Sequence, residues 1–330
     1  MNNQVFEEVK LIAKKYDIVF SDENDIEKCK QEFSNKVNWV SISIYQLLSE
    51  EFIREFANRV NWHNISIFQK LSEEFIREFA NRVNWNYISV DQNLSEGFIR
   101  EFTDRVNWVS ISNCQKLSEE FIREFANKVN WNDISIFQKL SEEFIREFSD
   151  KVDWYNISRY QKLSEAFVRE FANKVNWNNI SRYQKLSKGF IKEYNLTIPK
   201  DNWLYKTKEE KLSYLKENCD GIYEIVDDNY IVAYKSTKMG GYSTYNFQYQ
   251  YEVNKTYEAH CDCNVDNEDS FGLSAWTKEK ALKHYNRGKL FKVYINIEDI
   301  GAIVHDNKKI RCSKLTVISE ESFKGRDANE

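Results

Sequence analysis

The sequence lacks any run of about eighteen apolar residues, the length of a membrane-spanning helix, so we expect no contact with a membrane. Residues 1–8 lack the basic segment and apolar core of a secretory signal, and none is expected. Six cysteines in 330 residues are too sparse for a disulfide scaffold. These absences predict a cytoplasmic protein.

Proline and glycine are scarce, and their positions divide the chain. The only proline is Pro199, and seven of the nine glycines lie beyond residue 200. The apolar pattern also changes there, from helical spacing toward the alternation of strands. We therefore expect a domain boundary near residues 199–203.

The chain carries no large excess of charge of one sign. Acidic and basic residues are interspersed, and the net charge is −5 at pH 7. Nucleic acid is therefore not an expected partner. The chain has no P-loop, dinucleotide-binding fingerprint or nucleophile elbow. The sequence accordingly predicts no cofactor and no catalytic residue from its own motifs.

What the sequence has in abundance is one repeated unit of 23 residues. Tryptophan recurs at this interval without insertion or deletion, and a phenylalanine follows each one thirteen positions later. These residues are Trp39, Trp62, Trp85, Trp108, Trp131, Trp154 and Trp177, with Phe52, Phe75, Phe98, Phe121, Phe144, Phe167 and Phe190. A fixed period in this range indicates a repeat array.

Each unit is expected to form a helical hairpin. Phe75, Ile76, Phe79 and Val83 have the spacing of one helical face, which predicts a helix of about three turns capped by Ser72. One hairpin buries too little apolar surface to offset the entropy of ordering its chain. Neighbouring units must therefore stack, and residues 25–199 are predicted to form an α-solenoid.

A second, shorter helix completes the unit. Asn61 is its expected cap, and Trp62, Ile65 and Phe68 are expected to face one side. Residues 1–24 are interpreted as a degenerate capping repeat, with Tyr16 at the tryptophan position and Val19 at the position of the first-turn isoleucine.

Polar residues repeat as well. We expect the recurring Arg-Glu pairs to form ladders that support neighbouring repeats rather than a ligand site. Their arginines are Arg54, Arg77, Arg100, Arg123, Arg146 and Arg169. Ser66, Gln69 and their equivalents are expected to form hydrogen-bond ladders that close the helix ends.

Variation between repeats is concentrated on the second helix. If the array binds a partner, these variable positions are the candidate surface: His63, Asn86, Val109, Asn132, Tyr155, Asn178, Arg159 and Arg182. The alternative is drift at positions that packing does not constrain.

Residues 200–330 are predicted to form an α+β domain. We expect a helix over 207–219 and a hairpin across 227–229, followed by a strand pair around 242–257, a helix over 277–285 and a strand over 291–297. Residues 302–305 and 310–318 should pair as a second hairpin. Cys261 and Cys263 lack the paired spacing of a structural zinc site, so a surface loop is favoured over a metal site.

The repeats, with the pattern Leu-Ser-Glu-x-Phe-Ile-Arg-Glu-Phe-x-x-x-Val-Asn-Trp-x-x-Ile-Ser-x-x-Gln, resemble repeats of uncharacterised proteins from giant DNA viruses. The C-terminal segment resembles a phage domain of unknown function. Its matching pieces are residues 233–235, 251–257, 271–275, 284–285 and 309–318. Asn254 stands where that domain usually has glycine, and Leu273-Ser274 stand where Phe-His is usual. For a viral protein, the expected location is the host cell cytoplasm.

A more distant similarity links the C-terminal domain to ADP-ribosyltransferases. It implies that Lys235 holds a phosphate, that Ser274 sits in the nicotinamide pocket and that Tyr285 lines this pocket. Those enzymes also need an acidic residue on their last strand, where this chain has Arg-Cys-Ser at 311–313.

Two functions follow as hypotheses. The first is a non-enzymatic scaffold that binds a protein partner, whose identity the sequence does not give, along the solenoid. The alternative is an effector enzyme in which the solenoid targets an ADP-ribosyltransferase-like domain.

The repeat interpretation makes a prediction about deletions. Removing residues 72–94, one whole period, should leave a shorter folded array because the remaining neighbours still meet in register. Removing about half a period, residues 72–83, should abolish cooperative folding. Thermal melting followed by circular dichroism compares the two, and equal melting temperatures would contradict the unit assignment.

Overall fold

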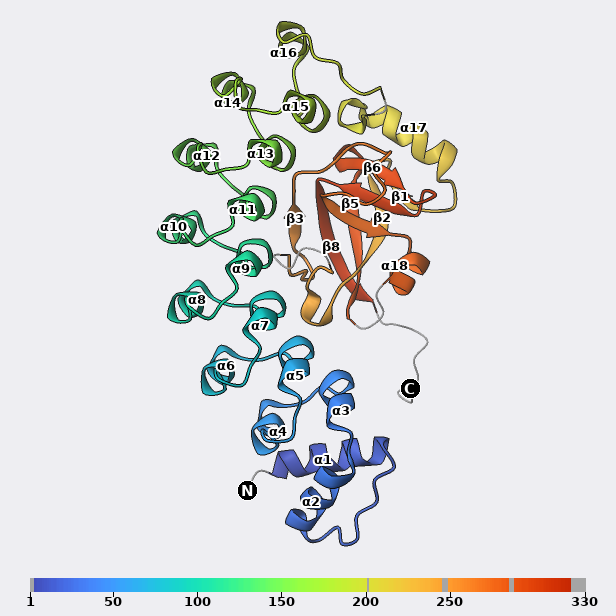
Figure 1. The fold of residues 1–330 in the computed structure, drawn as a ribbon. Helices are drawn as coiled ribbons and strands as arrows, with labels where there is room; N and C mark the ends of the chain where they lie inside the picture. Colours follow the sequence, from blue (N-terminus) through green and yellow to red (C-terminus); the bar gives the residue numbers. More distant parts are fainter. Residues whose placement is uncertain (1–2, 201, 245–248, 285–287, 322–330) are drawn as a thin grey trace. The chain divides into compact units, whose positions relative to one another are not determined.

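The computed structural model describes residues 3–200, 202–244, 249–284 and 288–321, and Figure 1 labels its elements. A regular run of helical repeats is followed by a small domain with an antiparallel sheet and a few helices. The predicted fold class is confirmed. The chain forms two compact units, residues 1–117 with 124–129 and residues 118–123 with 130–330, and each is described by itself.

Each regular repeat contributes two helices, which we call the Phe helix and the Trp helix. The Phe helices have six residues and are α4 (Glu50–Glu55), α6 (Glu73–Glu78), α8 (Glu96–Glu101), α10 (Glu119–Glu124), α12 (Glu142–Glu147), α14 (Glu165–Glu170) and α16 (Lys188–Glu193). The Trp helices have seven residues and are α3 (Trp39–Tyr45), α5 (Trp62–Phe68), α7 (Trp85–Asp91), α9 (Trp108–Cys114), α11 (Trp131–Phe137), α13 (Trp154–Tyr160) and α15 (Trp177–Tyr183).

The predicted caps are confirmed. The Ser72 hydroxyl accepts a hydrogen bond from the Phe75 amide at 3.2 Å, and the Asn61 side chain accepts one from the Asn64 amide at 3.0 Å. These bonds satisfy amides of the first helical turn that lack a partner within the helix. Caps therefore fix where both helices of a repeat begin.

The Phe helix is shorter than the expected three turns. It ends at Glu78 because Phe79 leaves helical geometry, and the Val83 amide then closes a turn on the Phe79 carbonyl at 3.1 Å. The Trp85 indole donates to the Ala80 carbonyl at 2.9 Å, so a side chain takes over an acceptor that a longer helix would use. The repeated tryptophan thus helps to end the helix.

The prediction that Phe68 faces the same side as Ile65 is wrong. Ile65 is fully buried, whereas the Phe68 side chain is 47% exposed. Trp62 is half-buried, with its ring 4.8 Å from that of Phe79. Phe68, the last residue of α5, therefore lies at the surface and not in the core.

The first repeat also differs from expectation. It has one long helix, α1 (Asn3–Lys15), and residues 16–25 form no second helix before α2 (Ile26–Lys36). Val19 is 78% exposed, so it does not fill the core position expected of it. Glu8 of α1 accepts hydrogen bonds from the Ser49 amide and hydroxyl at 3.0 and 2.5 Å. It thereby caps the next Phe helix from outside.

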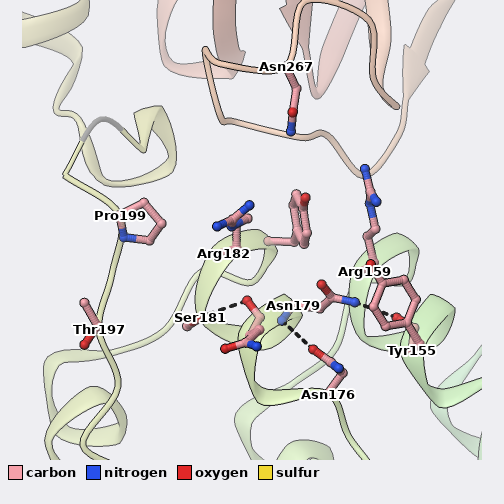
Figure 2. A pocket seen from close by; sticks show the side chains of 11 residues that line it. Tyr155, Arg159, Asn176, Asn179, Ser181, Arg182, Thr197, Pro199 and Asn267 are labelled. Carbon is pink, nitrogen blue, oxygen red and sulfur yellow. Dashed lines mark hydrogen bonds between the residues drawn. The ribbon is translucent and has the colours of Figure 1, made fainter.

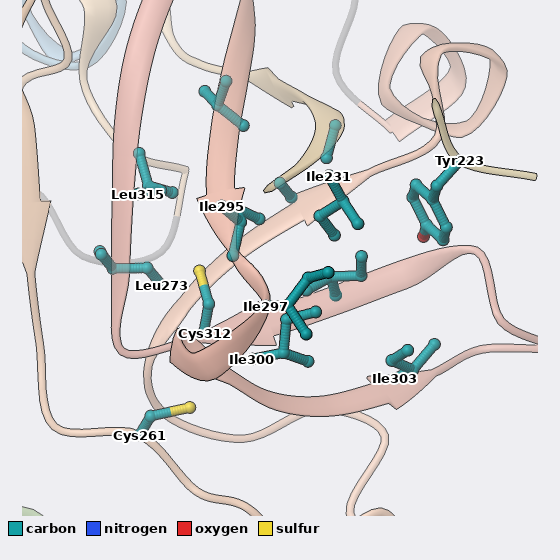
Figure 3. Close-up of a cluster of buried hydrophobic side chains, with 14 of the residues drawn as sticks. Tyr223, Ile231, Cys261, Leu273, Ile295, Ile297, Ile300, Ile303, Cys312 and Leu315 are labelled. Carbon is teal, nitrogen blue, oxygen red and sulfur yellow. The ribbon is translucent and has the colours of Figure 1, made fainter. Parts of the chain in front are cut away.

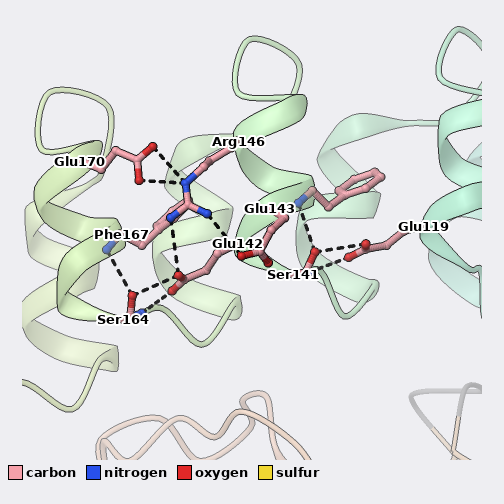
Figure 4. Close-up of polar contacts among 9 residues, drawn as sticks. Glu119, Ser141, Glu142, Glu143, Arg146, Ser164, Phe167 and Glu170 are labelled. Carbon is pink, nitrogen blue, oxygen red and sulfur yellow. Dashed lines mark hydrogen bonds and ion pairs between the residues drawn. The ribbon is translucent and has the colours of Figure 1, made fainter.

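The arginine ladder is confirmed, and Figure 4 shows one step in the second unit. Arg146 Nε donates to both carboxylate oxygens of Glu170 in the next repeat, at 2.8 and 3.0 Å. Glu142 in turn accepts from the Ser164 amide at 2.6 Å and from its hydroxyl at 3.1 Å. The carboxylates therefore link successive repeats in two ways, to arginine and to the serine caps.

The glutamine ladder is confirmed as well. In the first unit, the buried Gln92 amide nitrogen donates to the carbonyls of Ser66 and Gln69 at 3.1 and 2.9 Å. Its oxygen accepts from the Leu71 amide at 3.0 Å. One side chain thus satisfies three main-chain groups of the preceding repeat.

The C-terminal domain contains an antiparallel sheet with strand order β3-β8-β5-β2-β4-β7-β6. The short strand β1 pairs with residues 230–232, the first part of β2. Its strands are β1 (Glu224–Val226), β2 (Tyr230–Ser236), β3 (Thr256–Glu258), β4 (Leu273–Trp276), β5 (Leu290–Asn296), β6 (Ile300–Val304), β7 (Lys309–Cys312) and β8 (Lys314–Glu321). Its helical segments are η1 (Trp203–Tyr205), α17 (Lys208–Asn218), η2 (Met239–Gly241), α18 (Lys278–His284) and η3 (Ile297–Asp299).

One sheet face carries the main core of this domain, where Ile231, Ile295 and Cys312 gather (Figure 3). The predicted helices and both hairpins are confirmed, although the expected strand over 310–318 divides into β7 and β8 at Ser313. The strand pair expected around 242–257 is borne out in part. Residues 241–243 and 249–251 pair through one antiparallel bridge and two main-chain hydrogen bonds of 2.8 Å, and residues 245–248 lie outside the described residues. The strand β3 pairs with β8 instead.

Cys261 and Cys263 are buried, so the expectation of a surface loop is wrong. The fully buried Arg311 donates to the main-chain carbonyls of Asp262, Asn264 and Asn267 at 2.6 to 2.7 Å. These three bonds hold the loop over residues 262–267 against the sheet. A buried guanidinium needs such acceptors, which explains why the loop folds inward.

The start of the C-terminal domain continues the ladder of the repeats. Tyr205 occupies the place that glutamine holds in earlier repeats, because its hydroxyl accepts from the Leu186 amide and donates to the Gln184 carbonyl, both at 3.2 Å. Asn202 donates to the Arg182 carbonyl at 2.8 Å. Main-chain groups of the last repeat are therefore satisfied by the domain that follows it.

The glutamine ladder makes a prediction about stability. Gln92→Leu should destabilise the protein by roughly 2–4 kcal/mol, because it leaves three buried main-chain groups without partners. Arg77→Met is the matched control in the same unit, and it should cost less because Arg77 pairs with Glu101 at the surface. Urea denaturation of the full chain measures both variants. A larger loss for Arg77→Met would show that the ion pairs hold the repeats together.

Candidate binding surface on the Trp helices

The eight candidate residues all lie on Trp helices, but they do not form one site. His63, Asn86 and Val109 belong to the first unit and are exposed there. Four of the remaining five, Tyr155, Arg159, Asn178 and Arg182, line one cavity in the second unit. Asn132 is exposed in the same unit and does not line that cavity.

The cavity has a volume of approximately 740 Å³. Figure 2 shows Arg159 and Arg182 on neighbouring Trp helices, with Arg159 extending toward the loop that carries Asn267. Its lining consists of Tyr155, Arg159, Asn176, Asn178, Asn179, Ser181, Arg182, Tyr183, Thr197, Pro199 and Asn267. None of these side chains is acidic.

Several amides in the lining are already engaged. Asn176 accepts from the Asn179 amide at 3.0 Å as the cap of α15, and the Asn179 side chain donates to the Tyr155 carbonyl at 2.9 Å. The Asn267 side chain donates to the Asp262 carboxylate at 2.9 Å. These bonds hold the cavity walls in place, whereas Asn178 and Tyr155 present exposed side chains.

Phe271 of the C-terminal domain lies beside this cavity, on the Trp helices. Its ring centroid is 4.8 Å from that of Tyr160 and 5.6 Å from that of Tyr183. The Arg159 guanidinium lies 5.0 Å from the Tyr183 ring and 5.8 Å from the Phe271 ring. Aromatic pairs and cation–π contacts at such distances are favourable. Phe271 thus packs against the last residue of each of two successive Trp helices.

Burial affects the titratable groups at this contact. The His260 ring stacks on Phe271 at 5.4 Å, and burial lowers the pKa of His260 to about 4. Burial raises the pKa of Tyr160, and the positive charge of the nearby Arg159 acts in the opposite direction. His260 is therefore neutral at pH 7, and Arg159 carries the positive charge at the contact.

The residues named by the ADP-ribosyltransferase similarity are not brought together. In β2, Lys235 is on the same face as Ala233, whose side chain lies in the core. In β4, the side chains of Leu273 and Ala275 lie in the core, and Ser274 stands between them. Side chains alternate along a strand, so Ser274 and Lys235 are on opposite faces of the sheet. Tyr285 lies outside the described residues.

Lys235 is buried. Its ammonium group lies 5.2 Å from the centre of the Tyr251 ring, and burial lowers its pKa to about 8. Within the described residues, no group of three or more His, Cys, Asp or Glu side chains could hold a metal ion. No described helix has the length and apolar character to cross a membrane.

Comparison with protein-family models, with curated proteins and with solved structures finds no match to the chain.

Two residues of this surface escaped the sequence analysis, Phe271 and Asn267. Both belong to the loop region before β4, which has no repeat counterpart with which to compare them. The receiving residues Tyr160 and Tyr183 gave no signal either, because Tyr45, Phe68 and Phe137 stand at the same position of other repeats.

The buried lysine makes a prediction about pH. The pKa of Lys235 in the fold is below that of an unfolded lysine, so the unfolded state binds more protons between about pH 8 and 10.5. The cost of burial is therefore full below pH 8 and disappears as the pH approaches 10.5. Lys235→Met should raise the free energy of unfolding by about 3 kcal/mol at pH 7 and by much less at pH 10.

Urea denaturation at the two pH values measures this difference. Lys283→Met is the control, because Lys283 is exposed and its removal should have the same small effect at both pH values. A gain for Lys235→Met that does not change between pH 7 and pH 10 would contradict the depressed pKa.

Proposed function

We propose that the chain is a non-enzymatic interaction protein whose Trp helices bind a partner polypeptide. The observation that supports this most directly is the contact of Phe271 with Tyr160 and Tyr183. Here the Trp-helix surface already holds a polypeptide loop of the same chain. It does so through side chains and not through the main-chain ladders that build the repeat.

Among the equivalent positions in the first unit, which also include Asp91 and Cys114, the aromatic residues are Tyr45 and Phe68, at the ends of α3 and α5. These helices pack against each other as α13 and α15 do. Tyr45 is 62% exposed and Phe68 is 47% exposed, so this pair of rings is open to a partner. Exposed aromatic side chains on a regular scaffold are typical of binding surfaces.

The surroundings of this ring pair indicate the partner's chemistry. The residues before the rings are Ile44 and Ile67, where the second unit has Arg159 and Arg182. Leu47 is exposed close by in the sequence. An aromatic side chain with apolar neighbours suits this surface better than a charged segment.

Peptide selection tests the proposal. A random peptide library displayed on phage and selected against the full chain should yield peptides with an aromatic residue. The double variant Tyr45→Ala/Phe68→Ala should weaken their binding at least about tenfold, because aromatic anchors dominate such contacts. Fluorescence anisotropy with the selected peptides measures the affinity.

Val109→Ala is the matched control, since Val109 is an exposed apolar residue of the same unit outside the ring pair. It should leave the affinity unchanged, and circular dichroism should show that both proteins are folded. Selected peptides that bind the double variant as tightly as the wild type would overturn the proposal for this surface.

A further inference from the structure

Two arginines of the second unit differ from all others that the structure describes. Arg54, Arg77, Arg100, Arg123, Arg146 and Arg169 pair with glutamates, and Arg59, Arg82, Arg105 and Arg311 donate to main-chain carbonyls. Within the described residues, the side chains of Arg159 and Arg182 donate no hydrogen bond and form no ion pair. A guanidinium has five N–H donors, and none of those of Arg159 and Arg182 is used by a protein acceptor among the described residues.

Both unpaired arginines line the same cavity, which contains no acidic side chain. Arg159 Nε is buried without a hydrogen-bond partner, and aromatic rings at 5.0 to 5.8 Å hold its guanidinium in place. Arg182 is exposed on the neighbouring Trp helix. The cavity therefore offers one cation held between aromatic rings and one exposed cation, and its lining contains no acidic side chain.

The other repeats show which residues normally stand at the positions of Arg159 and Arg182. At the position five residues after tryptophan, the earlier repeats have Ile44, Ile67, Val90, Asn113 and Ile136. Arginine appears there only in the last two regular repeats, and these are the two that form the cavity. The ladder does not need a cation at this position, since the other repeats stack without one.

We propose that this cavity binds a single Asp or Glu carboxylate of a partner polypeptide. The guanidinium groups of Arg159 and Arg182 donate to the carboxylate oxygens, and the exposed Asn178 amide and Tyr155 hydroxyl lie at the same opening. Planar guanidinium matches carboxylate geometry with paired N–H donors. This inference rests on the proposed function, because it assigns a partner chemistry to one part of the Trp-helix surface.

Nearby acids favour a single carboxylate over a polyanion. The loop that supplies Asn267 also carries Asp262, Asp266, Glu268 and Asp269, and the chain as a whole has a net charge of −5. A nucleic acid would bring many phosphates into this negative surrounding, whereas one side-chain carboxylate contacts only the two arginines. The cavity also contains no lysine, which would help to neutralise a phosphate dianion.

Fluorescence anisotropy with the full chain tests the assignment. The probe is a labelled, C-terminally amidated hexapeptide with one glutamate among serines, which we call the glutamate peptide. The same peptide with glutamine in place of glutamate is the neutral control, and the same peptide with phosphoserine there is a third ligand. We expect the glutamate peptide to bind at least about tenfold more tightly than the glutamine peptide. Arg159→Met/Arg182→Met should reduce the affinity for the glutamate peptide at least about tenfold, and Arg182→Met alone should reduce it several-fold.

Lys188→Met/Lys192→Met is the matched control. It removes the same charge from exposed residues of α16 in the same unit, outside the cavity, and should leave the affinity within about twofold. Because Arg182 is exposed, the single variant keeps the test valid if the double arginine variant fails to fold.

Three results would overturn the inference: equal binding of the glutamate and glutamine peptides, equal losses in the arginine and lysine variants, or binding of the phosphoserine peptide more than about tenfold tighter than that of the glutamate peptide. The last result would assign the cavity to phosphate. If the carboxylate assignment fails, the proposed function can still be judged separately, because selected peptides that depend on Tyr45 and Phe68 would still bind.

Discussion

The buried glutamine of each repeat is the interaction on which the stacking of repeats depends. A helix of six or seven residues leaves most of its main-chain groups without partners inside the helix. In the second unit, Gln161 donates to the carbonyls of Ser135 and Gln138 and accepts from the Leu140 amide, and thereby satisfies such groups of its neighbour. Since buried polar groups are costly when unpaired, the next repeat is a structural requirement of the one before it. This explains why the spacing never varies.

The same requirement explains how the repeats end within the second unit. The ladder needs a last partner, and Tyr205 supplies it with one hydroxyl that both accepts and donates. The C-terminal domain therefore contacts the last repeat directly through hydrogen bonds. Its first segment completes the hydrogen bonding of the final repeat, and Phe271 adds a contact with the last two Trp helices.

Much of the repeat could be predicted because its causes are local or periodic. The Ser72 and Asn61 caps, the arginine ladder and the glutamine ladder follow from residue types at fixed spacing. Phe68 could not be placed correctly, because helical periodicity does not reveal which edge of a narrow stripe meets the core. The burial of Cys261 and Cys263 depends on Arg311, which lies about fifty residues further along the chain.

The candidate site illustrates a general property of nearly identical repeats. Where every copy has the same residue, as with the ladder glutamates, the residue is explained by contacts between copies. A residue present in two copies only cannot be explained in that way, because the other copies stack without it. Variation alone located Arg159 and Arg182, but it equally selected Asn132, which lines no part of the cavity. Physical observations distinguish the two arginines from positions that merely drift in sequence. They line a cavity without acidic side chains and have no acceptor there, whereas every other described arginine has an acceptor.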